Sequence, residues 1–227
     1  MEFNLADLFE IAVDAVPERT ALIAGDERRT YHELNDRANR LAHHLLDPNS
    51  GLALKTGEAV AIYSWNRAEW LEAEIAIYKA RGVVININYR YVIEELRYML
   101  ENSDAVAVIF ERTFAPLLAE IYQDCPKVRH FIAIDDKSSD SDAEIATALT
   151  ALKAKTYEAV MADASPEQDF APRSADDRYI LYTGGTTGLP KGVIWRQEDI
   201  FFAALGGGGF NQPPIVKPEE LRERILA

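Results

Sequence analysis

The stretch from Tyr182 to Gly192 concentrates residue types that suit the binding of a polyphosphate. Its glycines allow backbone N–H groups to approach anionic oxygens closely and tolerate positive φ angles. Its threonines add hydroxyl donors, and its lysine adds a compact positive charge. The candidate phosphate-binding residues are Thr183, Gly184, Gly185, Thr186, Thr187, Gly188 and Lys191. The alternative is a glycine-rich hairpin without a ligand, which the accompanying threonines and lysine disfavour.

Two familiar phosphate loops do not fit this stretch. The Walker A loop requires Gly-Lys followed by Ser or Thr, whereas Lys191 lies between Pro190 and Gly192. The dinucleotide-binding pattern G-x-G-x-x-G also fails, because Gly184 and Gly185 are adjacent. Both of those loops open a helix, but the residues that follow the lysine here are β-prone. We therefore expect a loop that joins two strands.

Short apolar runs alternate with amphipathic segments ahead of this stretch. We expect strands at residues 21–24, 59–63, 83–88, 106–110 and 130–134. We expect helices at residues 5–16, 92–101, 114–122 and 143–154, and two more that begin near Thr30 and Asn66. Near-continuous apolar strands that alternate with helices predict an α/β fold. Its sheet is expected to be doubly wound and mainly parallel, with helices on both faces, followed by the start of a second sheet.

Several residues indicate where these helices begin and end. Asn4 suits the N-cap of the first helix, and Asn66 suits that of the third. Thr30 and Glu33 have the spacing of a capping box. Gly82 follows the third helix, where a C′ glycine is expected.

Turn-forming residues divide the chain into segments. Residues 165–173 have the composition of a linker. We therefore expect one doubly wound subdomain over residues 1–170. Residues 171–227 would begin a second, incomplete subdomain that carries the candidate loop. The acidic, serine-rich residues 135–142 predict a solvated loop, and residues 206–209 are four glycines that predict a flexible or closely approached loop.

The overall charge excludes some partners. The chain has 24 Lys and Arg against 37 Asp and Glu, for a net charge of −13. This balance disfavours nucleic acids and anionic membrane surfaces as partners. The apolar runs of this sequence are too short for a transmembrane segment. A single cysteine and an acidic N-terminus without signal-peptide character predict a cytoplasmic protein.

The histidines and the cysteine carry no recognisable site pattern. His32, His43, His44 and His130 lack the spacing of metal ligands, and no metal site is expected. His43 and His44 are adjacent on a helix and cannot share one face, which predicts a solvated role for them. Cys125 has no motif around it and is expected to be structural.

The stretch from Tyr182 to Gly192 resembles the phosphate loop of the adenylate-forming superfamily. This superfamily includes acyl-CoA synthetases, nonribosomal peptide synthetase adenylation domains and luciferases. Its usual loop has Ser where this chain has Gly184. Thr30–Leu34 and Tyr78–Asn88 also resemble segments of the superfamily, although Asn86 replaces an expected proline.

The resemblance implies a two-step reaction. A carboxylate attacks the α-phosphorus of ATP, releasing pyrophosphate, and a thiol such as coenzyme A then displaces AMP. The candidate residues would bind the triphosphate on a loop that folds over ATP, with Mg²⁺ held mostly by residues outside this chain. Gly184 and the Trp195-Arg196 pair resemble the corresponding residues of bacterial acyl-CoA synthetases that act on fatty or lipid side-chain acids.

Later motifs of the superfamily, which complete the nucleotide and Mg²⁺ sites, do not follow Lys191 here. We therefore expect that this chain alone is inactive, and we assign no catalytic residue within it. Besides the N-terminal part of an acyl-CoA synthetase, two alternatives stay open: a non-catalytic module that binds ATP or pyrophosphate, and a structural or partner-binding module. An incomplete domain would also expose apolar surface, which predicts self-association.

Overall fold

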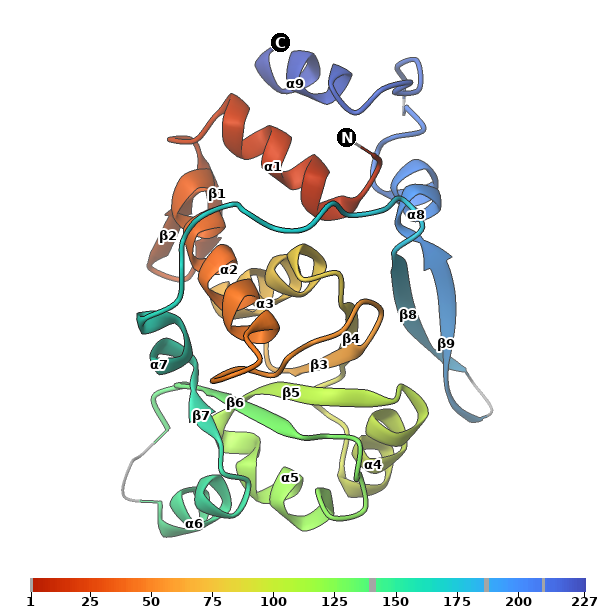
Figure 1. The fold of residues 1–227 in the computed structure, drawn as a ribbon. Helices are drawn as coiled ribbons and strands as arrows, with labels where there is room; N and C mark the ends of the chain where they lie inside the picture. Colours follow the sequence, from red (N-terminus) through yellow and green to blue (C-terminus); the bar gives the residue numbers. More distant parts are fainter. Residues whose placement is uncertain (1, 139–141, 186–187, 210) are drawn as a thin grey trace.

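A computed structural model describes residues 2–138, 142–185, 188–209 and 211–227 of the chain. It has an α/β fold with a five-stranded parallel sheet between helices, and a separate two-stranded hairpin at one end (Figure 1). The fold class expected from the sequence is therefore confirmed. None of the helices in the described part of the chain is both long and apolar enough to cross a membrane.

The described helices and strands follow one another along the chain. The strands are β1 (Thr20–Ala24), β2 (Glu27–Thr30), β3 (Ala59–Tyr63), β4 (Val83–Ile87), β5 (Ala105–Glu111), β6 (His130–Ile134), β7 (Lys155–Thr156), β8 (Arg178–Gly185) and β9 (Gly188–Arg196). The helices are α1 (Leu5–Ala15), α2 (Tyr31–Leu46), α3 (Ala68–Lys79), α4 (Ile93–Asn102), the 3-10 turn η1 (Arg112–Phe114), α5 (Ala115–Ile121), α6 (Ala143–Ala151), α7 (Tyr157–Ala162), α8 (Gln197–Ala204) and α9 (Glu220–Leu226).

The central sheet has the order β4-β3-β5-β6-β7, and all its neighbouring strands are parallel. Strand side chains alternate between the two faces of a sheet, so β3, β4, β5 and β6 each contribute to two cores. In β3, Val60 and Ile62 enter the core that α1, α2, α3 and α7 cover. Ala61 and Tyr63 enter the core that α4, α5 and α6 cover. Figure 1 shows α1–α3 on one side of the sheet and α4–α6 on the other.

The short polar strands were not predicted from the sequence. The strand β2 reads Glu-Arg-Arg-Thr and pairs with β1 in an antiparallel hairpin. The strand β7 contains two polar residues and joins the sheet beside β6, directly before α7. Neither strand has an apolar period, because each lies at an edge and half or more of its residues are exposed.

Two of the expected helix ends are confirmed and two are wrong. The Asn4 side chain accepts a hydrogen bond from the amide of Ala6, and Thr30 forms its capping box with Glu33. Asn66 does not cap α3, because its N-cap is Arg67 without a side-chain cap bond. After α3 the left-handed residue is Arg81, at φ 58°, rather than Gly82. Gly82 instead allows close packing, since a Cβ there would lie 2.8 Å from an Ile77 methyl carbon.

The solvated role expected for His44 is wrong. His44 is buried on α2, and its Nε2 lies 3.1 Å from the Nε2 of His130 at the start of β6. Burial lowers the pKa of each imidazole to about 4. Two neutral rings can share one N–H···N hydrogen bond, whereas protonation of both would place two N–H groups against each other. His43, the residue before His44, is partly exposed, and its Nε2 lies 3.0 Å from Oδ1 of Asp169.

We predict that the pair makes folding sensitive to mild acid. The histidine pKa falls from about 6.5 in the unfolded chain to about 4 in the folded chain, so the unfolded chain binds more protons in this window. Stability is therefore present above pH 6.5 and lost as the pH falls towards 4. Between pH 7 and pH 5 the free energy of unfolding should drop by on the order of 2 kcal/mol for each buried imidazole.

Urea unfolding at several pH values measures this effect. The double variant His44→Gln/His130→Gln, which cannot titrate there, should show a smaller drop between pH 7 and pH 5 than the wild type. His32→Gln, at an exposed position of the same helix, is the matched control and should behave as wild type. An equal drop in all three proteins would contradict the prediction.

Candidate functional site

The candidate phosphate-binding stretch lies on the β8–β9 hairpin, at one edge of the molecule (Figure 1). The two strands are antiparallel, with Arg178 opposite Arg196 and Thr183 opposite Lys191. The register shifts after Thr183, and Gly185 then pairs with Gly188. The expectation that this stretch joins two strands is therefore confirmed.

The described tip of the hairpin is exposed. Thr183, Gly184, Gly188 and Lys191 are all exposed, whereas Thr186 and Thr187 lie outside the described residues. Neither Gly184 nor Gly188 has a left-handed φ, so they are not required here for a strained turn. A Cβ at either position would meet nothing within 4 Å. The glycines thus leave open space beside the backbone that a ligand could approach closely.

Lys191 is available for an anion. It makes no ion pair with any residue that the structure describes. The acidic residues near the other end of the hairpin are engaged by Arg196, which pairs with Asp176 at 2.5 Å and Glu198 at 2.7 Å. Arg196 thereby offsets part of the negative charge that these carboxylates place beside the hairpin.

The base of the hairpin is fixed to the amino ends of the central strands. Arg81, just ahead of β4, forms two hydrogen bonds with the carboxylate of Asp177, at 2.8 and 3.1 Å. Arg178 donates to the carbonyl of Gly57, just ahead of β3, at 2.6 Å. Paired bonds between a guanidinium and a carboxylate are directional, so they fix the angle at which the hairpin leaves the sheet.

The helix α4 contacts both strands of the hairpin close to the candidate residues. The Tyr98 hydroxyl donates to the carbonyl of Pro190 at 2.8 Å, and the Tyr182 hydroxyl donates to the side-chain oxygen of Asn102 at 2.8 Å. Burial raises the pKa of the Tyr182 phenol, which is protonated at neutral pH in any case and can therefore donate. The sequence carries no signal for these contacts, because nothing in it indicates which helix meets the hairpin.

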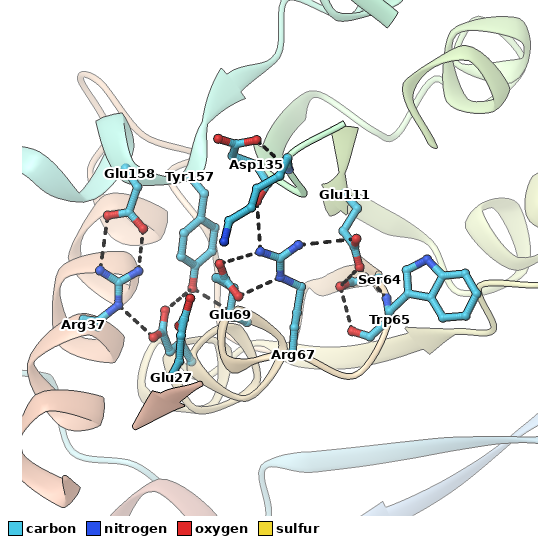
Figure 2. A network of polar contacts seen from close by, with 12 residues as sticks. Glu27, Arg37, Ser64, Trp65, Arg67, Glu69, Glu111, Asp135, Tyr157 and Glu158 are labelled. Atoms are coloured by element: carbon cyan, nitrogen blue, oxygen red, sulfur yellow. Dashed lines mark hydrogen bonds and ion pairs between the residues drawn. The ribbon is translucent and has the colours of Figure 1, made fainter. Parts of the chain in front are cut away.

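A second polar cluster lies at the carboxyl edge of the central sheet, at the opposite end from the base of the hairpin (Figure 2). Arg67 occupies its centre. Its guanidinium pairs with Glu69 at 2.7 Å and with Glu111 at 3.3 Å, and donates to the carbonyl of Asp135 at 2.9 Å. Glu111 also accepts from the Ser64 hydroxyl at 2.8 Å.

The neighbouring part of this cluster is also paired internally. Arg37 contacts the buried Glu72 at 2.7 Å and Glu158 at 2.6 Å, and the Tyr157 hydroxyl donates to Glu72 at 3.2 Å. Burial raises the pKa of Glu72 in spite of these partners. Doubly wound sheets commonly bind ligands at this edge, but here the charged groups satisfy one another. We interpret this cluster as a structural one that connects α2, α3 and α7.

The described residues offer no evident metal centre. No group of three or more His, Cys, Asp or Glu among them is arranged to hold a metal ion. Cys125 is buried, and burial raises its thiol pKa to about 11, so the thiol is protonated at neutral pH. The thiol is thus a poor nucleophile and metal ligand.

A family model described as AMP-binding enzyme matches residues 9–225 of the chain. A medium/long-chain-fatty-acid–CoA/3-oxocholest-4-en-26-oate–CoA ligase from Mycobacterium marinum is 47% identical over 220 residues. A 3-oxocholest-4-en-26-oate–CoA ligase from Rhodococcus rhodochrous is 46% identical over 219 residues. These matches cover 95% and 96% of this chain but only 38% of each relative.

Solved structures share the fold. The crystal structure of the anthranilate CoA ligase AuaEII in complex with anthranoyl-AMP matches with a TM-score of 0.76 and 23% identity, over 90% of this chain and 37% of that one. A putative long-chain-fatty-acid CoA ligase from Rhodopseudomonas palustris matches with a TM-score of 0.72 and 25% identity, over 89% of this chain and 46% of that one.

Two glycines of the hairpin should respond differently to the same substitution. A Cβ on Gly192 would lie 3.1 Å from atoms of Ile180 and of the Tyr182 ring, whereas a Cβ on Gly184 meets open space. We therefore predict that Gly192→Ala lowers the free energy of unfolding by about 1–2 kcal/mol through overpacking. Gly184→Ala should leave it unchanged or raise it slightly. Urea unfolding measures both, and equal effects of the two substitutions would contradict the prediction.

Proposed function

Because this chain belongs to the family of AMP-binding enzymes, we propose that it forms the triphosphate-binding part of an acyl-CoA ligase. The enzyme would activate a carboxylic acid as an acyl-adenylate and transfer the acyl group to coenzyme A. The chain spans about 38% of the length of the relatives above, so this activity is proposed for a longer protein or assembly. Alone, the chain is expected to be inactive.

The observation that carries the proposal is the exposed hairpin, whose Lys191 forms no ion pair with any of the residues that the structure describes. Thr183 and Lys191 lie opposite each other, beside glycines with open space around them. We propose that Thr183, Gly184, Gly185, Thr186, Thr187, Gly188 and Lys191 bind the triphosphate. Attack of a carboxylate on the α-phosphorus leaves negative charge on the departing pyrophosphate. Preoriented N–H groups, a hydroxyl and an ammonium would stabilise that charge as it develops.

The substrates follow from the same proposal. ATP and coenzyme A are the expected co-substrates. The hairpin residues 178–196 include no carboxylate, so the hairpin itself does not fit a Mg²⁺ site. We propose that Mg²⁺ arrives with the nucleotide and is held mainly by residues outside this chain. The names of the two ligase relatives support a medium- or long-chain fatty acid, or a steroid side-chain acid, as the acyl substrate.

We also propose that residues 1–170 and 171–227 belong to different subdomains of a cytoplasmic enzyme. The second segment exposes Leu181, Val193 and Ile194 to between 42% and 63% of their full area. Val193 and Ile194 are neighbours and point to opposite faces of the hairpin, so both faces expose apolar surface. This exposed apolar surface supports self-association of the isolated chain. A light-scattering measurement that gives the mass of a single chain would count against self-association.

Titration calorimetry with Mg-ATP and with Mg-pyrophosphate tests the site. We predict that Lys191→Ala weakens binding of either ligand by about tenfold or more, because it removes a charged hydrogen bond to phosphate. Lys217→Ala changes an exposed lysine of the C-terminal segment and is the matched control. Equal affinities for the wild type and Lys191→Ala would exclude this lysine from the site.

The ligase activity is tested by supplying the missing part. We would produce this chain together with the portion of the Mycobacterium marinum relative that lies beyond the match, and assay acyl-CoA formation from ATP, coenzyme A and a long-chain fatty acid. Activity should require both parts and should fall strongly with Lys191→Ala. If a soluble complex of the two parts forms but makes no acyl-CoA with fatty or steroid acids, the proposed activity is wrong.

A further inference from the structure

The C-terminal half of α4 contacts both strands of the hairpin. Tyr98 and Asn102 are four residues apart and therefore lie on the same face of the helix. Tyr98 donates to the carbonyl of Pro190 in β9, and Asn102 accepts from the hydroxyl of Tyr182 in β8. One helix face thus holds the two strands of the hairpin.

These two contacts flank most of the candidate phosphate-binding residues, with the Pro190 contact between Gly188 and Lys191. Pro190 is buried and precedes Lys191, and Tyr182 precedes Thr183. Between the two contacts the described residues are exposed at Thr183, Gly184 and Gly188. The contacts therefore separate a fixed stem from the tip, and the peptide that leads into Lys191 belongs to the fixed stem.

The helix itself is a rigid support. Leu96, Met99 and Leu100 of α4 are at most 2% exposed and pack in the core on one face of the central sheet. The Tyr182 ring also lies close against Gly192, since a Cβ there would be 3.1 Å from the ring. A displacement of the peptide between Pro190 and Lys191 would thus break the Tyr98 bond and disturb this packing.

We propose that Tyr98 is a positioning residue for the phosphate-binding hairpin, which fixes the backbone ahead of Lys191 from the neighbouring helix. The expected effect of Tyr98 on ligand binding rests on the function proposed above. The structural part of the proposal, that the hydroxyl restrains the hairpin stem, does not depend on any ligand. Tyr98 touches no phosphate in this scheme and acts only through the position of Lys191.

The variant Tyr98→Phe removes the hydroxyl and keeps the ring. A single neutral hydrogen bond corresponds to a factor of about two to ten in an equilibrium constant. We expect amide hydrogen exchange in the hairpin peptides to become faster by that factor, and exchange in β3 and β5 to become faster by no more than that factor. We also expect Mg-pyrophosphate binding to weaken by a similar factor under conditions where the variant is fully folded. A loss of overall stability alone would not weaken binding by a folded protein, so this readout separates positioning from a general structural role.

Two further variants complete the test. Tyr122→Phe, just after α5, removes a hydroxyl whose one hydrogen bond among the described residues is to the Gln123 side chain, and it should behave as wild type. Asn102→Ala should accelerate exchange in β8 and provides a second readout if Tyr98→Phe folds poorly. Hairpin exchange that stays at the wild-type rate in a folded Tyr98→Phe overturns the proposal, as does unchanged exchange in Asn102→Ala where Tyr98→Phe does not fold. Faster exchange in a protein whose wild type binds no pyrophosphate would support the restraint and reject the proposed function of the hairpin.

Discussion

The position of the β8–β9 hairpin depends on how its base is held against the central sheet. A two-stranded hairpin is marginally stable in water on its own. Here the paired hydrogen bonds between Arg81 and Asp177, and the bond from Arg178 to Gly57, fix its base at the amino ends of β4 and β3. The tip can therefore expose its polar groups without losing its orientation.

Exposed binding groups must also stay free of competing partners in an acidic chain. The arginines of this protein are largely engaged with carboxylates: Arg67 and Arg37 pair at the carboxyl edge of the sheet, and Arg196 pairs beside the hairpin. Lys191 differs from them, because it has no ion pair within the described part of the chain. Doubly wound sheets often bind ligands at the carboxyl edge of the sheet. In this protein the charged groups at that edge are paired with one another, so we interpret the edge as structural.

The sequence predicted features that depend on local pattern. The apolar strands of the sheet and the capping box of Thr30 and Glu33 were identified in this way, as was the strand-to-strand character of the glycine-rich stretch. It did not predict contacts between distant segments. The pairing of His44 with His130 and of Tyr98 with Pro190 spans 86 and 92 residues, and each is determined by how helices and strands pack. The roles of the seven candidate residues remain predictions, and two of them lie outside the described residues.

The central claim is that the hairpin between Tyr182 and Gly192 binds the phosphates of a nucleotide. Backbone amide chemical shifts, recorded by NMR while Mg-pyrophosphate is added to the purified chain, report on it most directly. The account predicts saturable shifts for Gly184, Gly188 and Lys191, with little change for Arg67 and Glu69 at the opposite edge of the sheet. Shifts confined to that opposite edge, or none at millimolar ligand, would contradict it.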